Sequence, residues 1–121
     1  MAKILVVDDE PDIVRVVVKL MTARGHDVRT AADGNEALEQ ILADRPDVVI
    51  LDLNLPGMSG FEVCRRLKSD DATRAIPIVM MTAAYVSVDD ARQGEDFGAD
   101  EYVVKPFLRE VLVHNVERLI R

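Results

Sequence analysis

The sequence predicts an α/β fold in which a parallel sheet carries helices on both faces. Short apolar runs alternate with amphipathic stretches about five times along the chain. The runs at residues 4–7 and 48–51 contain no polar residue, which is typical of strands buried on both faces. Strands that are joined by helices favour parallel pairing, because the helical crossover returns the chain to the same end of the sheet.

The first strand and the first helix follow from the order of the residues. Residues 3–7 form a strand whose apolar run, residues 4–7, stops at three acids, and Pro11 then suits the first position of a helix. Apolar residues recur at helical spacing until Gly25, a typical helix stop. These residues are Ile13, Val17, Leu20 and Met21. Three extra valines in the stretch leave a strand as the alternative interpretation.

The second and third strands enclose another predicted helix. Residues 27–31 form a short strand, and Asp33 and Glu36 then have the spacing of a capping box, which starts a helix. The apolar spacing continues through Leu42, and Pro46 ends the turn that follows. Residues 48–51 are the third strand.

The next unit repeats the pattern. Phe61, Cys64 and Leu67 recur at helical spacing, so Cys64 is predicted to be a core side chain. Residues 76–81 are the fourth strand, with Pro77 near its start, where a missing N–H donor is tolerated.

The last unit completes one predicted domain over residues 1–121. A weaker helical pattern covers residues 88–98, and residues 102–104 form a fifth strand. The final helix runs to Arg121 and carries an apolar stripe made of Leu108, Leu112, Val116 and Leu119. A chain of 121 residues has the usual length of a single domain.

Composition excludes several classes of function. The formal net charge of −7 disfavours direct binding to nucleic acid or to an anionic membrane surface. No apolar run approaches the roughly 20 residues that span a bilayer, and the start of the chain has no signal-peptide layout. A single cysteine rules out an internal disulfide framework and a thiolate zinc cluster. We therefore expect a soluble, cytoplasmic domain.

Polar residues with reactive or charged groups follow the predicted strands. Asp8 and Asp9 follow the first strand, Asp52 the third, Thr82 the fourth and Lys105 the fifth. Ligands of open parallel sheets bind beyond the carboxyl ends of the strands. We therefore expect three carboxylates, a hydroxyl and an ammonium group to meet at one edge.

Three neighbouring carboxylates need a cation. A pair of like charges about 4 Å apart costs roughly 4 kcal/mol at an effective dielectric near 20. Mg²⁺ accepts carboxylate ligands and leaves room for a phosphate oxygen, whereas the absence of His and Cys at these strand ends argues against zinc and copper. Asp8 and Asp9 are predicted to be a metal pair. Asp52, alone at the middle of the sheet, is the best candidate for a nucleophile that forms an aspartyl phosphate.

These residues belong to a set of segments that resembles the receiver domain of bacterial two-component response regulators. The matching segments are residues 4–10, 51–60, 81–83, 98–100, Tyr102 and residues 105–107. Each segment is weak evidence alone, but together they occur in the family's order and cover almost the whole chain. The resemblance implies a flavodoxin-like (βα)5 three-layer sandwich with sheet order 2-1-3-4-5.

The resemblance also implies a role for each site residue. Asp52 would accept a phosphoryl group from a phosphohistidine on a sensor histidine kinase or a phosphotransfer protein. The Mg²⁺ ion would be held by Asp8, Asp9, Asp52 and the backbone carbonyl of Asn54. Thr82 and Lys105 would bind the phosphoryl oxygens, and the small Ala83 would leave them room. Tyr102 would be an aromatic switch, and Lys105–Pro106 would be a cis peptide.

The output implied by the resemblance is regulatory. The domain would catalyse only its own phosphorylation and dephosphorylation, and would otherwise not act as an enzyme. Its switching face would comprise the helix over 88–98, the strand over 102–104 and the final helix. That face would bind a second copy of the chain or an output domain beyond Arg121. The positions of Asn54 and Ala84 influence how long the phosphoryl group persists in the family, and the lifetime here stays open.

Three other functions are alternatives to this interpretation. A Mg²⁺-dependent phosphatase with an aspartyl nucleophile would carry that nucleophile after the first strand. A flavin-binding module would need a Ser/Thr/Gly-rich phosphate loop where residues 8–10 are acidic. A receiver-like domain that binds partners without phosphorylation is the third alternative. His26 and His114 lack a ligand pattern and are predicted to be surface residues.

Overall fold

Five parallel strands form a single sheet in the computed structural model, which describes residues 2–83 and 99–120. The strand order is β2-β1-β3-β4-β5, which confirms the predicted order. The strands are β1 (Lys3–Val7), β2 (Asp27–Ala31), β3 (Val48–Asp52), β4 (Ile78–Ala83) and β5 (Glu101–Lys105). The described helices are α1 (Pro11–Ala23), α2 (Gly34–Ala43), α3 (Gly60–Ser69) and α5 (Arg109–Leu119). The helix predicted over 88–98 lies outside the described residues.

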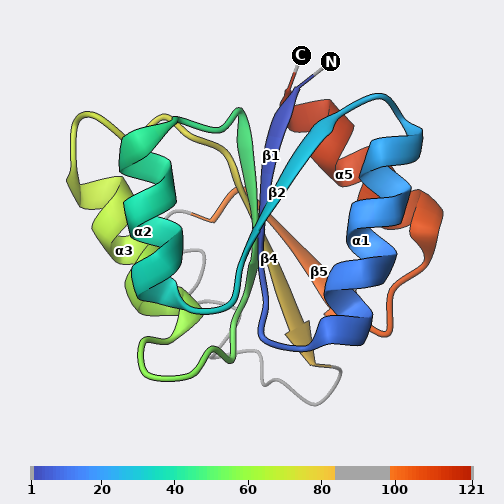
Figure 1. The fold of residues 1–121 in the computed structure, drawn as a ribbon, viewed down its shortest axis with the longest axis horizontal. Coiled ribbons are helices and arrows are strands. Elements are labelled where there is room, and N and C mark those ends of the chain that lie inside the picture. The colour runs from blue at the N-terminus through green and yellow to red at the C-terminus, as the bar shows by residue number, and fades with distance from the viewer. Residues whose placement is uncertain (1, 84–98, 121) are drawn as a thin grey trace.

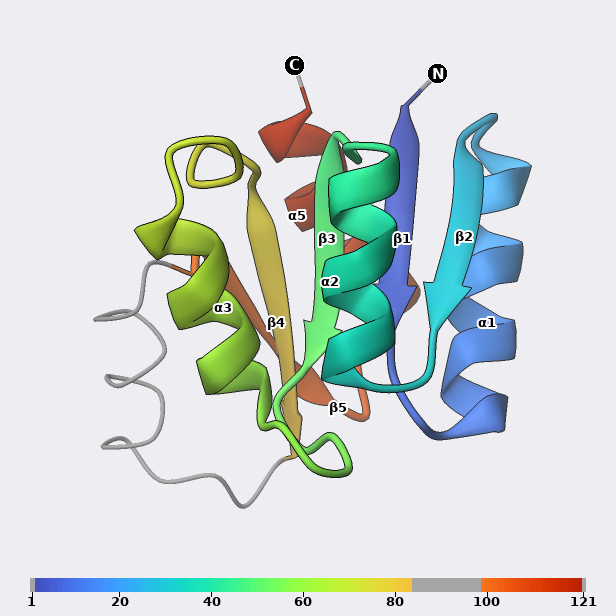
Figure 2. The ribbon, with the colours of Figure 1, turned by 60° about the vertical axis from the view of Figure 1, so that its left-hand side comes forward.

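Helices cover both faces of the sheet. α1 and α5 lie on one face, and α2 and α3 lie on the other (Figure 1). The same arrangement is visible from a second direction, in which α2 and α3 lie in front of the sheet (Figure 2). The molecule therefore has three layers, as an α/β sandwich should.

Each strand contributes to two separate hydrophobic cores, because successive side chains point to opposite faces. On β1, Leu5 and Val7 pack in the core beneath α2 and α3. Ile4 and Val6 pack in the core beneath α1 and α5. An uninterrupted apolar run is therefore required here, which explains why this strand shows no alternation of polar and apolar residues.

Local sequence signals explain where the helices begin. The Asp33 side chain accepts a hydrogen bond from the Glu36 N–H at 2.8 Å, as the capping spacing predicts. Pro11 occupies the first turn of α1. The strand alternative for that valine-rich stretch is wrong, because Val17 and Met21 face the core one helical turn apart.

Two expectations need correction. β4 begins at Ile78 instead of residue 76 and continues to Ala83. The Ile76 N–H donates to the Thr73 carbonyl in a turn, and Pro77 has no N–H to enter the ladder. His26 is not a surface side chain: it is only 8% exposed and lies 3.0 Å from Glu117. His114 is exposed and Cys64 is buried, as predicted.

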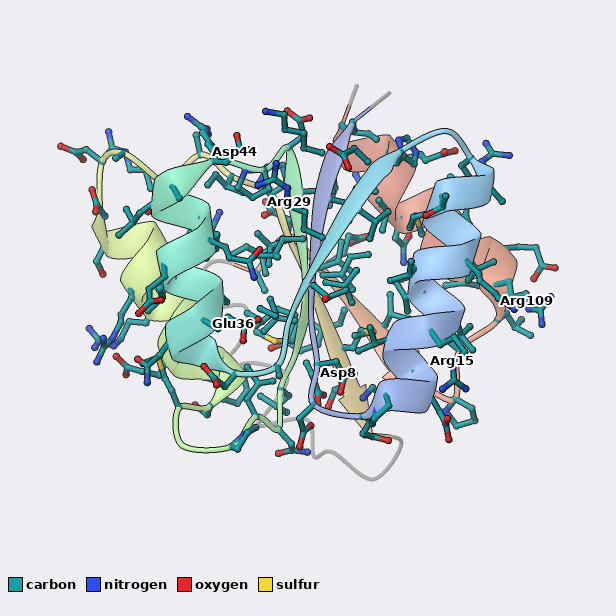
Figure 3. All side chains as sticks on the ribbon, viewed as in Figure 1. Asp8, Arg15, Arg29, Glu36, Asp44 and Arg109 are labelled. Atoms are coloured by element: carbon teal, nitrogen blue, oxygen red, sulfur yellow. The ribbon has the colours of Figure 1, made fainter. Side chains whose placement is uncertain are left out.

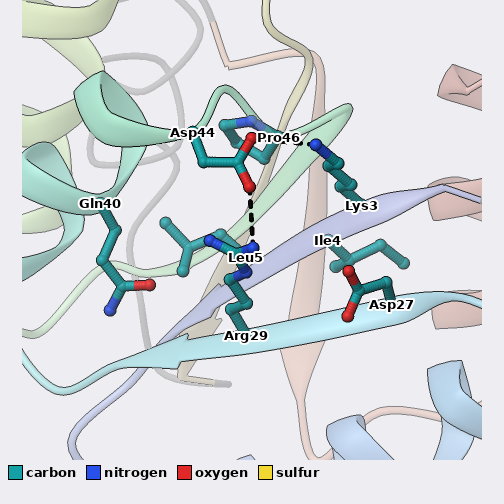
Figure 4. Close-up of a pocket in the computed structure, with 8 residues that line it drawn as sticks. All are labelled: Lys3, Ile4, Leu5, Asp27, Arg29, Gln40, Asp44 and Pro46. Carbon is teal, nitrogen blue, oxygen red and sulfur yellow. Dashed lines mark hydrogen bonds and ion pairs between the residues drawn. The ribbon is translucent and has the colours of Figure 1, made fainter.

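The two ends of the sheet differ in character. Asp8 lies at one end, and Asp44 and Arg29 lie at the other (Figure 3). At the amino end, the Asp44 carboxylate pairs with Lys3 at 2.9 Å and Arg29 at 2.8 Å within a small pocket (Figure 4). These ion pairs connect the C-terminal end of α2 to β1 and β2. The carboxyl end carries the predicted site. Among residues 2–83 and 99–120, no helix has the length and apolar character needed to cross a membrane.

Candidate functional site

The candidate site is built at the carboxyl ends of the strands. Asp8 directly follows β1, Asp52 ends the neighbouring β3, and Lys105 ends β5. Asp8 is 2% exposed and Asp52 is 3% exposed. The fold therefore brings together two buried acids and a lysine that are remote in sequence, as the pattern of strand ends predicts.

Lys105 joins the carboxylates into one cluster. Its Nζ atom lies 3.0 Å from Oδ2 of Asp8, 3.3 Å from Oδ1 of Asp52 and 3.4 Å from Oε1 of Glu10. The other oxygen of Asp8 accepts a hydrogen bond from the Glu10 N–H at 3.0 Å. One ammonium thus faces three carboxylates, which leaves an excess of negative charge at the site.

The electrostatics of the site act on Asp52 and Lys105 in particular. Burial and the nearby charge of Asp8 raise the pKa of Asp52 to about 6, against the opposing effects of Lys105 and of a hydrogen bond from the Asn54 backbone. Burial acts to lower the pKa of Lys105, but its hydrogen bond to Asp8 and the charge of Asp52 outweigh burial and raise it. Asp52 is therefore mainly a carboxylate at pH 7, and Lys105 is a cation.

The donor set suits a hard divalent cation. Carboxylate oxygens of Asp8, Glu10 and Asp52 lie within 4.8 Å of one another. Oxygen ligands of this kind are those that Mg²⁺ prefers. Asp9, predicted to pair with Asp8, is exposed and does not belong to this group. Sequence reasoning missed Glu10, although its place next to the two aspartates and before Pro11 was a usable signal.

Thr82 lies on β4, one residue beyond Met81, which is the register partner of Asp52. It is 3% exposed, and its Oγ1 atom has no hydrogen-bond partner among the described residues. A buried hydroxyl without a partner is unfavourable, so this atom is available to an incoming acceptor. Ala83 pairs with Lys105 across the β4–β5 ladder. The side chain of Ala83 and the whole of Ala84 lie outside the described residues.

The remaining predicted residues flank the site. Tyr102 on β5 is half-buried against the core beneath α2 and α3, and its register partner is Met80, two residues before Thr82. Thr82 and Tyr102 therefore share one face of the sheet. The Lys105–Pro106 peptide bond is cis. Asn54 is exposed, and its backbone hydrogen-bonds the Asp52 carboxylate.

Gly60 allows α3 to begin close to this edge. A Cβ atom at Gly60 would lie 2.4 Å from the Asp52 carbonyl oxygen, and the Gly60 N–H donates to the Leu53 carbonyl at 2.8 Å. Only a residue without a side chain permits this approach.

Fold and site together define a signalling receiver domain. Residues 4–117 match the family model of the response regulator receiver domain, and the chain belongs to this family. The phosphatase and flavin-module alternatives are therefore set aside.

Individual relatives and solved structures are similar to this chain over nearly its whole length. The chain is 43% identical over 119 residues to the DNA-binding response regulator MtrA of Mycolicibacterium smegmatis, covering 98% of this chain and 50% of MtrA. It is 43% identical over 120 residues to the response regulator PleD of Caulobacter vibrioides, covering 99% of this chain and 26% of PleD. Among solved structures, the Vibrio cholerae chemotaxis protein CheY4 matches with a TM-score of 0.91 and 37% identity, covering 98% of both chains. The chain thus spans about half of MtrA and about a quarter of PleD.

Proposed function

We propose that residues 1–121 form one receiver domain in which Asp52 is the phosphoacceptor of a two-component system. The observation that carries the proposal is the buried Asp52 carboxylate, which lies 3.3 Å from Lys105 at the end of a central strand. The site is nucleophilic at neutral pH and has a cation beside it. The donor would be a phosphohistidine on a sensor histidine kinase or a phosphotransfer protein.

The reaction is a transfer of a phosphoryl group to Asp52. A carboxylate oxygen of Asp52 forms a bond to phosphorus, the phosphorus–nitrogen bond of the phosphohistidine breaks, and the imidazole nitrogen retains the electron pair. Lys105 and the hydroxyl of Thr82 would hold the phosphoryl oxygens, and Ala83 would leave them room. The catalysis is confined to the domain's own phosphorylation and dephosphorylation.

The reaction would depend on Mg²⁺. Asp8, Asp52 and the Asn54 carbonyl would hold the ion, and Asp9 would contribute directly or through water. The neighbouring carboxylates of Asp8, Glu10 and Asp52 support a divalent cation at this position. When bound, the ion supplies positive charge that offsets the carboxylates and the phosphoryl oxygens. Lys105 would then leave Asp8 and Asp52 and face the phosphoryl group.

Phosphorylation would change the conformation of a surface that binds partners. Thr82 would move towards the phosphoryl oxygens and Tyr102 would turn inward, since both lie on the same face of adjacent strands. The switching face would comprise β5, α5 and the helix predicted over 88–98. Exposed apolar side chains on the described part of this face support a binding role. These side chains are Val104, Leu108 and Val111.

This face would bind a second copy of the chain or an output domain. MtrA is named as DNA-binding, so an output domain beyond Arg121 is one proposed partner. The receiver itself would not bind nucleic acid or membrane, because its net charge is −7. We further propose that it works in the cytoplasm.

Intact mass spectrometry tests the proposal. The protein is incubated with acetyl phosphate and Mg²⁺, and we expect one phosphoryl group per chain. Asp52→Asn should abolish the adduct, whereas the exposed Asp71→Asn should not. An adduct that survives Asp52→Asn, or no adduct on the unmodified protein, contradicts the proposal.

A further inference from the structure

Glu10 differs from the other acids that contact Lys105. Its side chain is 61% exposed, whereas the side chains of Asp8 and Asp52 are 0% and 4% exposed. It is also the N-cap residue of α1, whereas Asp52 ends β3 and Asp8 directly follows β1. Glu10 therefore approaches the ammonium from the solvent side, while the two aspartates approach from the interior.

The Glu10 side chain is not used to cap its helix. An N-cap acid commonly accepts a hydrogen bond from the first turn, as Asp33 does for α2. Glu10 makes no such bond, and its carboxylate instead lies 3.4 Å from the Lys105 Nζ atom. Its backbone N–H meanwhile binds Asp8 at 3.0 Å. The side chain and the backbone N–H of Glu10 thus both contact members of the cluster.

A cation at the aspartates would change the balance of forces on Lys105. The resting ammonium is held by Asp8 at 3.0 Å and by Asp52 at 3.3 Å. A divalent ion bound to those same carboxylates would repel the ammonium and withdraw its two nearest partners. Of the three carboxylates around Lys105, that of Glu10 would then be the one still available to pair with the ammonium, from the solvent side.

We propose that Glu10 is a positioning residue that retains Lys105 at the rim of the site when a divalent cation occupies Asp8 and Asp52. This inference rests on the proposed function. Glu10 does not touch the reacting atoms in this mechanism. It acts by holding the ammonium within reach of the phosphoryl oxygens that arrive at Asp52.

Glu10→Gln is the informative substitution, because it preserves the size of the side chain and removes its charge. We expect the phosphorylation rate at saturating Mg²⁺ to fall by about three- to tenfold, since Lys105 would no longer be held at the rim. Glu10→Asp keeps the charge on a shorter stem and should restore part of the rate. Glu39→Gln, the same chemical change at an exposed position of α2, is the matched control and should leave the rate unchanged.

Nuclear magnetic resonance of the Lys105 side-chain nitrogen supplies a readout that does not depend on activity. In the unmodified protein, we expect the Lys105 ammonium signal to stay protected from exchange when Mg²⁺ is added. In Glu10→Gln, the signal should be protected without Mg²⁺ and lost when Mg²⁺ saturates the site. Amide spectra of each variant verify that it is folded.

The outcomes separate this inference from the proposed function. A Glu10→Gln protein with an unchanged Lys105 signal and an unchanged rate at saturating Mg²⁺ would overturn the role of Glu10, even if its Mg²⁺ affinity had fallen. Absence of phosphorylation on the unmodified protein would overturn the proposed function instead. The Lys105 signal would then still decide whether Glu10 holds the ammonium in the presence of Mg²⁺.

Discussion

The ammonium group of Lys105 and the carboxylate of Asp8 form an ion pair of 3.0 Å, although the two residues are 97 positions apart in the sequence. The Asp8 side chain is fully buried and that of Lys105 is 13% exposed. The pair connects the end of β1, an interior strand of the sheet, with the end of β5 at its edge. We expect both the stability of the resting state and the proposed chemistry at Asp52 to depend on this connection.

Replacing Lys105 should destabilise the protein in a pH-dependent manner. Lys105→Met leaves Asp8 and Asp52 buried without their cation, and loss of one partner of a buried pair costs about 3–5 kcal/mol. The loss should be largest at pH 8 and smaller at pH 5, because protonation of Asp52 relieves the repulsion. Urea unfolding in metal-free buffer at both pH values measures this loss in the free energy of unfolding. An equal loss at both pH values would show that packing, and not charge, is responsible.

Asp52→Asn should stabilise the metal-free protein above pH 6. The pKa of Asp52 is raised from 3.8 to about 6 in the folded state. Between these values the folded chain binds more protons than the unfolded chain, so Asp52 makes stability fall as pH rises from about 4 to about 6. Removing the carboxylate should add about 2–3 kcal/mol at pH 8 and little at pH 4.

The check is the urea midpoint of Asp52→Asn at pH 4 and pH 8, with chelator present. Asp71→Asn is the control, since Asp71 is 90% exposed and pairs only with the surface residue Arg74 among the contacts described. A midpoint for Asp52→Asn that equals that of the unmodified protein at pH 8 would contradict the raised pKa.

Thr82→Val should stabilise the resting domain while weakening its response. The Thr82 hydroxyl is buried without a hydrogen-bond partner among the described residues, so a methyl group of similar shape removes an unfavourable polar atom. We expect a gain of about 1 kcal/mol in the free energy of unfolding. The phosphorylated form should lose one donor to the phosphoryl oxygens and therefore show a smaller change in the Tyr102 environment, measured by nuclear magnetic resonance. A lower stability of Thr82→Val would mean that the hydroxyl is already satisfied.

Gly60→Ala should cost more stability than Gly57→Ala. The added Cβ at Gly60 meets the Asp52 carbonyl oxygen at 2.4 Å, so the backbone must shift, at a cost of about 1–3 kcal/mol. Gly57 has a φ of +78° and no atom within 4 Å of its Cβ position, so only backbone strain of about 1–2 kcal/mol is expected. Thermal unfolding ranks the two variants. Gly60→Ala alone should also slow phosphorylation of Asp52, because it moves the strand end that carries the acceptor.

Much of the fold could be predicted because its signals are local. Apolar runs, capping residues and prolines specify strands and helix starts within a few neighbouring residues, as Pro11 and Asp33 show. The start of β4 was placed two residues early, because Ile76 is buried and apolar but lies in a turn before Pro77. Burial and strand pairing are separate properties, and hydrophobicity reports only the first.

The candidate site could likewise be predicted in part from the sequence. The sequence by itself determined that Asp8, Asp52, Thr82 and Lys105 follow strands, and parallel topology then required them to share one edge. Only the tertiary structure decided that Lys105 touches three carboxylates and that Glu10, instead of Asp9, completes the cluster. The physical reason is that residue order specifies which strand end carries a group. Side-chain direction and ångström-scale contacts depend on how the packed layers orient those ends towards one another.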